Sequence, residues 1–407
     1  MRNDPDEASL AATLLEGFAA LSADGHGITR PAYSAIESDC LNFVAEVAAP
    51  LGLEAHRDAV GNLWLAPPGL GDAPAPACGS HMDSVPQGGN FDGGAGVVAG
   101  LLIALRAARD ALPMRALALR GEESPWFGAP YVGTRAAFGA LDATELARPR
   151  RDTGKSLSTH LREIGGDPAV AGGGKPVPEL LRTTAFHELH IEQGPVLVDK
   201  SLPAAAVSAV RGHRRWSEAS CTGEAGHSGV VPRHLRADPM MAVAELLYDL
   251  DTLWAKSIED GADMVITAGM VSTEPDLAAV TRIPGRVAFS LDIRSGDRAT
   301  LDAAQRFVAR RCADIAAVRR VRFDMGPLVQ AAPIRLDSGA VEAALPEPIT
   351  LVSGAGHDAA EFARRGMPAS MVFVRNRNGS HNPQEAMEIP DLMAGVDALY
   401  AALRPRA

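Results

Sequence analysis

Histidine and carboxylate side chains recur along this chain at places where short strand-like segments end. His81 ends a run of small residues and is followed by the polar segment 82–86, and Asp92 lies in the glycine-rich segment 88–94. Glycine lets the backbone turn tightly and lets an ion approach it closely. Imidazole and carboxylate groups are ligands of divalent ions such as zinc. The two residues therefore predict part of a metal site at the carboxyl edge of a sheet.

Three further segments offer the missing ligands. Glu122 and Glu123 follow a strand-like run, His190 lies near the end of another, and His381 lies in a polar loop. Two ions that keep positions open for water and substrate need about three protein ligands each. Five residues suffice when one carboxylate is shared, and Asp92 in its glycine-rich loop is the natural bridge. Adjacent glutamates point in different directions, so one can bind an ion while the other acts as a base.

Composition excludes several classes of function. The chain has 407 residues, 46% of them hydrophobic, which is enough for two domains with large cores. A net charge of -11 offers no basic field for nucleic acid or an acidic membrane. Four scattered cysteines favour reduced thiols, and the longest charge-free apolar run, 93–105, is too short to span a bilayer. The acidic segment 1–7 is unlike a signal peptide, so we expect a cytoplasmic protein.

The spacing of apolar residues predicts an α/β fold in the first part of the chain. Helical spacing occurs at 8–20 and 35–48, and strand-like runs occur at 53–57, 63–66, 115–120 and 186–191. From about residue 327 the chain is expected to return to this domain, with strands at 349–352 and 371–374 and a helix at 358–364 between them. We therefore predict one domain formed by residues 1–209 and 327–407.

The segment between these two parts, 210–326, has a different pattern. The expected strands are 216–222, 264–271, 286–294 and 319–323, and the expected helices are 239–254 and 300–316. The order strand, helix, strand, strand, helix, strand is typical of a small α+β domain in which two helices cover one face of a sheet. We predict that this segment is an inserted second domain.

Five longer motifs resemble those of a known family. The motifs are Gly79-Ser80-His81-Met82-Asp83-Ser84-Val85, Gly88-Gly89-Asn90-Phe91-Asp92-Gly93, Glu188-Leu189-His190-Ile191-Glu192-Gln193-Gly194-Pro195, Ser353-Gly354-Ala355-Gly356-His357-Asp358-Ala359 and Ser380-His381-Asn382-Pro383. In this order they resemble the zinc-dependent amidohydrolases of the M20 metallopeptidase superfamily. Within it the chain is similar to the hydantoinase/carbamoylase branch, which contains N-carbamoyl-L-amino-acid hydrolases, allantoate amidohydrolase and ureidoglycolate amidohydrolase. The resemblance implies a mixed-sheet zinc-exopeptidase-like catalytic domain with an inserted ferredoxin-like dimerisation domain.

The resemblance also implies roles for residues of the predicted metal site. His81, His190 and Asp92 would hold one ion, and Asp92, Glu123 and His381 the other. Asp83 would orient the ring of His81. Glu122 would be the general base that deprotonates water and later protonates the leaving nitrogen. Zinc is the expected ion, although manganese, cobalt and nickel accept the same ligands.

Further roles implied by the resemblance lie mostly in the inserted domain. His227 would reach the active site of a neighbouring subunit and stabilise the oxyanion, so a homodimer is expected. Arg294 would bind a substrate carboxylate, a task that suits a planar guanidinium. Gln193 would line the substrate pocket, and so would Thr281, which stands where the family has asparagine.

The resemblance predicts a binuclear amidohydrolase that hydrolyses a non-peptide C–N bond in a small ureido or amide compound carrying a carboxylate. Trp126, Arg233 and Thr281 depart from the family pattern near the pocket, whereas the metal and base positions match it. Two alternatives remain open: an M20 aminoacylase or dipeptidase, and a non-catalytic binding protein on the same scaffold. The presence of Glu122 argues against the second.

Overall fold

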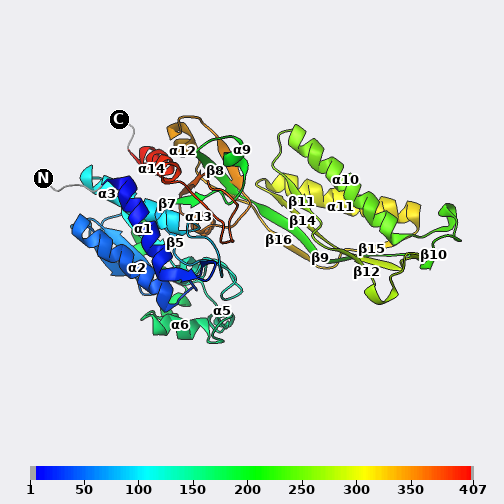
Figure 1. Ribbon diagram of the computed structural model, residues 1–407, viewed down its shortest axis with the longest axis horizontal. Coiled ribbons are helices and arrows are strands. Elements are labelled where there is room, and N and C mark those ends of the chain that lie inside the picture. The colour runs from blue at the N-terminus through cyan, green and yellow to red at the C-terminus, as the bar shows by residue number, and fades with distance from the viewer. Residues whose placement is uncertain (1–5, 405–407) are drawn as a thin grey trace. The chain divides into compact units, whose positions relative to one another are not determined.

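The computed structural model describes residues 6–404 and shows an α/β protein formed by two compact units (Figure 1). The larger unit contains the chain up to residue 208, then 336–351 and the chain from 356 onward, and the smaller unit contains 209–335 and 352–355. The fold class predicted from the sequence is confirmed, while the predicted domain limits at 209/210 and 326/327 stay predictions. Residues 1–5, in the acidic first segment, lie outside the described part. Within residues 6–404, no helix combines the length and apolar character needed to cross a bilayer.

A mixed β-sheet forms the centre of the larger unit. Its strands follow one another in the order β8 (Ala204–Val210), β19 (Ala369–Val374), β7 (Thr183–Ile191), β5 (Ala75–His81), β6 (Arg115–Leu119), β4 (Leu63–Ala66) and β3 (Glu54–Arg57), and β18 (Thr350–Ser353) also pairs with β8. β19, β7, β5 and β6 are mutually parallel. β8 pairs antiparallel with β19, β4 pairs antiparallel with β6, and β3 pairs antiparallel with β4. In register, His81 lies opposite Leu119, and Val374 lies opposite Ile191. The carboxyl ends of the four parallel strands therefore share one edge of the sheet, where ligands bind in open α/β sheets.

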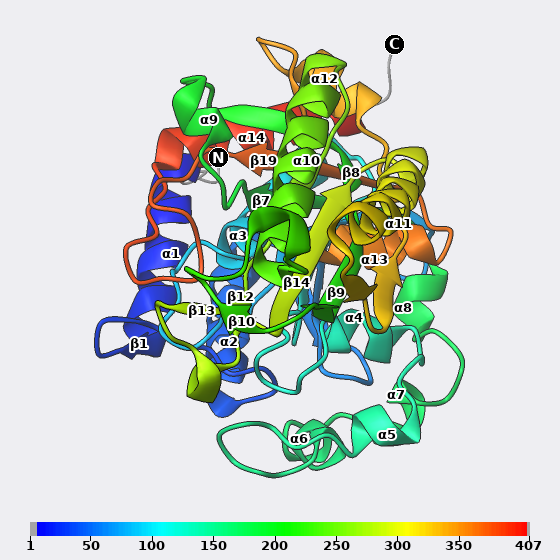
Figure 2. The ribbon, with the colours of Figure 1, turned by 90° about the vertical axis from the view of Figure 1, so that its right-hand side faces the viewer.

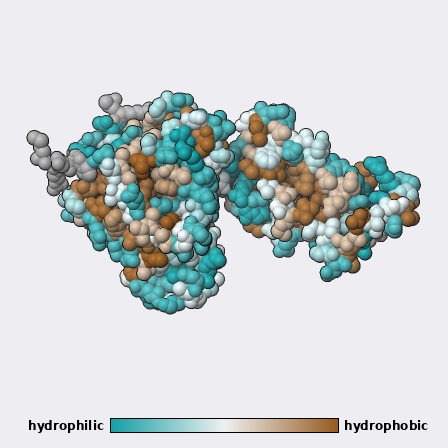
Figure 3. Space-filling model, viewed as in Figure 1, coloured by the Kyte–Doolittle hydropathy of each residue, from teal (hydrophilic) through white to brown (hydrophobic). Residues whose placement is uncertain are grey.

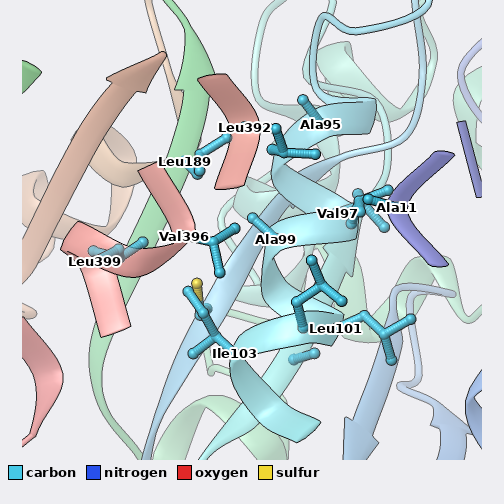
Figure 4. Close-up of a cluster of buried hydrophobic side chains, with 14 of the residues drawn as sticks. Ala11, Ala95, Val97, Ala99, Leu101, Ile103, Leu189, Leu392, Val396 and Leu399 are labelled. Atoms are coloured by element: carbon cyan, nitrogen blue, oxygen red, sulfur yellow. The ribbon is translucent and has the colours of Figure 1, made fainter. Parts of the chain in front are cut away.

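Helices cover both faces of this sheet. One face packs against α3 (Gly94–Arg109), α14 (Ile389–Leu403), α1 (Glu7–Ser22), α2 (Ala35–Ala48) and α12 (Gly339–Ala344). Figure 4 shows Ala95, Ala99 and Ile103 of α3 beside Leu189 of β7 and Val396 of α14. Phe186 lies three residues before Leu189, so it points to the other face. There it stacks on Phe362 of α13 (Asp358–Arg364), with ring centroids 4.0 Å apart.

Glycines allow α3 to lie directly against the strands. A Cβ at Gly96 would come within 2.2 Å of the Leu189 carbonyl oxygen and 2.4 Å of the Ser80 Cβ, and one at Gly100 within 2.5 Å of the Cys78 carbonyl oxygen. The absence of these methyl groups brings the helix close to β5 and β7. It thereby fixes the position of the loop that precedes α3 and carries Asp92.

The smaller unit contains a separate antiparallel sheet. Its strand order is β11 (Val265–Thr267), β14 (Arg286–Ser295), β9 (Gly212–Thr222) and β15 (Arg322–Asp324), with β12 (Val271–Thr273) also on β14 and β16 (Leu328–Ala331) also on β9. Val287, Phe289, Leu291 and Ile293 alternate along β14 and are all buried. They face α10 (Pro239–Glu259) and α11 (Arg298–Arg319), which lie together over β9 and β14 (Figure 2). The order and the two covering helices agree with the sequence pattern.

Three details of the fold differ from the sequence expectations. The strand expected at 264–271 is divided into β11 and β12, with Gly269 in the interruption between them. The strand expected at 319–323 begins only at Arg322, because α11 continues to Arg319 and ends at Arg320 in the left-handed conformation (φ 56°). β8, which lies inside the sheet, was not expected, since its alanine-rich sequence shows no alternation of apolar and polar residues.

The close packing of α3 gives a prediction about stability. We expect Gly96→Ala to lower the free energy of unfolding by about 1–3 kcal/mol, because the new methyl group must displace α3 from β5 and β7. Gly339→Ala in α12 is the matched control, since its Cβ would meet no atom within 4 Å. Urea unfolding followed by circular dichroism measures both effects. Equal midpoints for Gly96→Ala and the unmodified protein would contradict the packing argument.

Candidate metal centre

The predicted ligands all lie at the carboxyl edge of the parallel strands in the larger unit. His81 is the last residue of β5, His190 is the penultimate residue of β7, and Glu123 follows the end of β6. His381 lies in the loop after β19, and Asp92 in the loop between β5 and α3. Segments separated by up to 300 residues are thus brought to one edge of the sheet by its strand order.

The five side chains form two groups that share Asp92. In the first, Asp92 Oδ1 lies 3.3 Å from His81 Nε2 and 3.2 Å from His190 Nε2. In the second, His381 Nε2 lies 3.5 Å from Asp92 Oδ2 and 3.3 Å from Glu123 Oε1. The two oxygens of Asp92 therefore face different groups. This is the arrangement that the prediction of a bridging carboxylate requires, although the ligand roles themselves stay predictions.

These separations fit a metal ion. Zinc binds nitrogen and oxygen at about 2.0–2.2 Å, so two ligands of a tetrahedral ion lie about 3.4 Å apart. The ring orientations fit as well. His81 Nδ1 lies 3.0 Å from the carbonyl oxygen of Asp83, and His190 Nδ1 lies 2.9 Å from that of Ile191. A carbonyl oxygen can only accept a hydrogen bond, so each Nδ1 keeps a proton, and Nε2 is the ring nitrogen that binds an ion once its own proton is displaced.

Electrostatics at the site also favour a cation. Burial opposes ionisation of Asp92, yet His190 and the other two imidazoles hold the pKa of this carboxyl well below its usual range. Burial likewise lowers the pKa of His81, but the carboxylates of Asp83 and Asp92 raise it well above the ordinary value. Hydrogen bonds to Asp92 and Glu123 raise the pKa of His381 to about 10. In the metal-free protein, the imidazoles hold protons, and the neighbouring carboxylates stabilise their positive charge.

Asp83 supports the site in a way that the sequence did not indicate. Its carbonyl oxygen is closer to the ring of His81 than its carboxylate, which lies 3.4 Å away. The carboxylate instead accepts the backbone N–H of Glu122 at 2.9 Å and that of Glu123 at 3.0 Å. Asp83 therefore joins the loop after β5 to the turn after β6, and so sets the positions of the two glutamates.

Glu122 differs from its neighbour in having no place in either ligand group. It is 9% exposed, and burial raises the pKa of its carboxyl well above the ordinary value, with further contributions from Glu123 and Asp358. His81 acts in the opposite direction. The carboxyl of Glu122 thus lies outside both ligand groups and interacts electrostatically with His81 of one and Glu123 of the other. Its role as the base stays a prediction.

Asp92 has further partners, one of which the sequence analysis missed. Gln193 Nε2 donates to Asp92 Oδ2 at 2.7 Å, so this residue contacts the proposed bridging ligand. Ser380 Oγ lies 2.6 Å from the same oxygen and 2.6 Å from Glu385 Oε2. Glu385 was not predicted because no local pattern marks it. Its position four residues after His381, in the same polar loop, is the only signal in the sequence.

The structure distinguishes between the two histidines of β7. His187 and His190 are three residues apart in the strand, so they point to opposite faces of the sheet. His187 bonds to Ser370 Oγ at 2.8 Å, and burial lowers its pKa to about 4. His190 alone joins a ligand group. His357, which the sequence analysis left out of the ligand set, belongs to neither group.

The remaining predicted residues lie in the smaller unit. His227 is exposed on the short strand β10 (Gly226–His227), and its Nδ1 accepts the N–H of Gly229 at 3.1 Å. The N–H of the ring is therefore at Nε2. Thr281 lies beside this strand, and its carbonyl oxygen accepts the N–H of Ser228 at 2.8 Å. Arg294 donates through Nε and Nη2 to Asp292 Oδ2 at 3.1 and 2.8 Å. The roles of these three residues stay predictions.

Two departures from the family pattern have different surroundings. Trp126 is 3% exposed, and its indole N–H donates to the carbonyl oxygen of Ser84 at 2.7 Å. It therefore packs against the segment that follows His81. Arg233 is exposed in a short 3₁₀-helix, Arg233–Leu235, of the smaller unit.

The contacts of Asp83 give a prediction for the metal-free protein. Asp83→Asn keeps one acceptor oxygen but turns an amide N–H₂ toward the other backbone N–H. We expect the free energy of unfolding to fall by about 1–3 kcal/mol, the cost of an unsatisfied buried donor. Asp72→Asn is the control, because the side chain of Asp72 is 80% exposed. Equal urea midpoints for the two variants would show that Asp83 does not hold the turn.

Comparisons with known proteins agree with this geometry. Residues 77–404 match the sequence profile of the family described as Peptidase family M20/M25/M40. The chain is 33% identical to N-carbamoyl-L-amino acid amidohydrolase of Geobacillus stearothermophilus, with 92% of each protein covered. It is also 33% identical to allantoate amidohydrolase of Bacillus subtilis, with 93% of this chain and 92% of the relative covered. The crystal structure of a hydantoinase/carbamoylase family amidase from Burkholderia ambifaria superposes with a TM-score of 0.83 at 27% identity and covers 97% of this chain and 95% of its own. The chain therefore belongs to the M20 peptidase family, a metal-dependent family, and within it to the hydantoinase/carbamoylase branch of amidohydrolases.

Proposed function

We propose that this protein is a binuclear amidohydrolase that hydrolyses the C–N bond of a small ureido compound carrying a carboxylate. The observation that carries the proposal is the pair of ligand groups sharing Asp92, with the buried carboxyl of Glu122 interacting electrostatically with His81 of one group and Glu123 of the other. The names of two relatives, an N-carbamoyl-L-amino acid amidohydrolase and an allantoate amidohydrolase, support the ureido class of substrate.

In this proposal His81, His190 and Asp92 hold one ion, and Asp92, Glu123 and His381 the other. Divalent ions, zinc first and manganese, cobalt or nickel as alternatives, supply Lewis acidity and an activated water at such a site. Glu122 takes one proton from the attacking water as the C–O bond forms, and it then delivers a proton to the leaving nitrogen as the C–N bond breaks. The Asp83 carboxylate holds Glu122 in place through the backbone N–H.

Substrate recognition is assigned to three residues in the proposal. Arg294 binds the carboxylate of the substrate, and Thr281 and Gln193 contribute polar edges to the pocket. Asp292 already occupies the Nε–Nη2 edge of Arg294, and Arg215 donates to the same carboxylate oxygen at 3.0 Å. Nη1 of Arg294 donates to the carbonyl oxygen of Gly354 at 3.0 Å, so all three guanidinium nitrogens already have partners. A substrate carboxylate must therefore share these donors or displace Asp292.

The proposal includes a homodimer in which His227 of one subunit completes the active site of the other. Apolar side chains on the smaller unit support an interface (Figure 3). Met241 and Tyr248, which are 51% and 72% exposed, lie seven residues apart on one side of α10. Met270 and Val271 are exposed at β12, which pairs with β14 alone among the described strands. Both features suit pairing of the smaller units through helices and sheet edges.

The first test is release of ammonia. We expect the metal-loaded protein to release ammonia from at least one of N-carbamoyl-L-amino acids, allantoate and ureidoglycolate, because their hydrolysis frees a carbamoyl or ureido nitrogen. A coupled glutamate dehydrogenase assay measures the product for each of the four metals. Turnover of N-acetyl amino acids or dipeptides, with no ureido substrate hydrolysed, would instead identify an aminoacylase or dipeptidase. Binding without any turnover would identify a binding protein.

The control for chemistry in this test is Glu122→Gln. It should keep both ions and lower kcat by about 10²- to 10⁴-fold, since it removes the proton carrier and no ligand. Glu54→Gln, an exposed change on β3, is the matched variant and should leave kcat unchanged. Full activity in Glu122→Gln would overturn the assignment of the base.

The second test concerns the role of His227 in the dimer. His227→Ala and Glu122→Gln should each be nearly inactive, but a heterodimer of the two contains one site with both residues intact. Co-expression with two affinity tags isolates that heterodimer, and we expect about half the activity of the unmodified dimer. If His227 acts within its own chain, both sites are defective and the heterodimer stays inactive.

A further inference from the structure

Glu385 is a buried carboxylate that bonds to two separate loops. It is 7% exposed, although it lies in a polar loop after β19. Its Oε1 accepts the backbone N–H of Phe91 at 2.9 Å and that of Asp92 at 3.1 Å. Its Oε2 lies 2.6 Å from Ser380 Oγ. One side chain thus contacts the backbone beneath the proposed bridging ligand and the residue before His381.

The loop that carries Asp92 leaves room for this contact. A Cβ at Gly89 would lie 2.1 Å from the carboxyl group of Glu385, so any larger residue would displace the carboxylate. The absence of a side chain at Gly89 therefore leaves the space in which the Glu385 carboxylate accepts the two N–H groups. Glu385 is joined in this way to Phe91 and Asp92, which lie 294 and 293 positions earlier in the chain.

Ser380 extends the connection to the side chain of Asp92. Its hydroxyl oxygen is 2.6 Å from both Asp92 Oδ2 and Glu385 Oε2. A hydroxyl has one proton to donate, so Ser380 stands between two acceptors. An amide in place of the Glu385 carboxylate could donate to Ser380 and leave the hydroxyl proton for Asp92.

The two ligand groups depend on this connection to different degrees. His81 and His190 lie at the ends of strands, and the carbonyl oxygens of Asp83 and Ile191 fix their rings. His381 lies in an irregular loop, has a positive φ of 61°, and has a side chain that is 51% exposed. Unlike His81 and His190, His381 therefore needs a further contact to fix its position relative to Asp92.

From these contacts we propose that Glu385 is a positioning residue that ties the Asp92 loop to the His381 loop and so keeps the ion of the Asp92–Glu123–His381 group bound. The inference rests on the proposed binuclear function, because it concerns how tightly the second of two ions is held. It assigns Glu385 no contact with substrate and no proton transfer. Partners that orient metal ligands are typically worth about 10- to 100-fold in metal affinity.

Metal content tests the proposal independently of activity. The full-length protein is loaded with zinc, separated from free ion and measured by inductively coupled plasma mass spectrometry, and the affinity of each ion is found by competition with a chelator. We expect two ions per chain in the unmodified protein. Glu385→Ala should retain one tightly bound ion and hold the other about 10- to 100-fold more weakly. Glu388→Gln, an exposed change three residues along the chain, should retain two.

Two further variants separate positioning from charge and from folding. Glu385→Gln keeps an acceptor for Phe91 and Asp92 and offers a donor to Ser380, so it should retain both ions. A loss as large as that of Glu385→Ala would assign the effect to charge and overturn the positioning role. If circular dichroism shows that Glu385→Ala does not fold, Ser380→Ala decides. It removes the hydroxyl that joins Asp92 to Glu385, keeps the bonds of Glu385 to the Phe91 and Asp92 backbone, and should weaken the same ion.

The outcomes distinguish this inference from the proposed function. Glu385→Ala with two ions held at the unmodified affinity, or with both ions weakened equally, would overturn the inference while leaving the binuclear site in place. An unmodified protein that binds fewer than two ions with zinc, manganese, cobalt and nickel would contradict the proposed function itself.

Discussion

Buried carboxylates at one edge of the sheet are the constraint on which the larger unit depends. Asp83, Asp92, Glu122, Glu123 and Glu385 are each at most 9% exposed. Removing one ionised carboxylate from water costs roughly several kcal/mol unless hydrogen bonds or opposite charges compensate. Around these groups the compensation comes from backbone N–H groups, a serine, a glutamine and three imidazoles. Divalent cations would complete it, which is why this edge is suited to binding metal.

The same carboxylates also organise the loops. Asp83, after β5, accepts N–H groups of the turn after β6, and Glu385, after β19, accepts N–H groups of the loop before α3. Glu192, after β7, accepts the N–H groups of Val196 and Leu197 in the same manner. Three loops at this edge are thus held by acidic side chains, and in two of them the acidic residue comes from a different loop. These loops have little regular secondary structure. The contacts with acidic side chains take the place of the backbone hydrogen bonds that a helix or strand would provide.

Sequence patterns predicted the parts of this arrangement that depend on strand ends. His81, Glu123 and His190 each lie at or beside the end of a buried parallel strand, and such ends share one edge. Glu385 could not be predicted, because burial of a glutamate in a polar loop depends on a glycine almost 300 residues earlier. β8 was missed because alanines on a strand buried on both sides show no alternation. The role of His227 depends on a second subunit, which residue spacing within one chain cannot reveal.

The two ligand groups differ in how far they are open to solvent. His81 and His190 are each 1% exposed, whereas the side chain of His381 is 51% exposed. In the proposed site, an ion of the second group would be held by Asp92, Glu123 and one accessible imidazole, whereas an ion of the first would be held by Asp92 and two buried imidazoles. Exchange with the surrounding medium would therefore begin at His381. The supply of metal around the protein, together with the intrinsic order of affinities among divalent ions, would have its greatest influence on the identity of the ion in the His381 group.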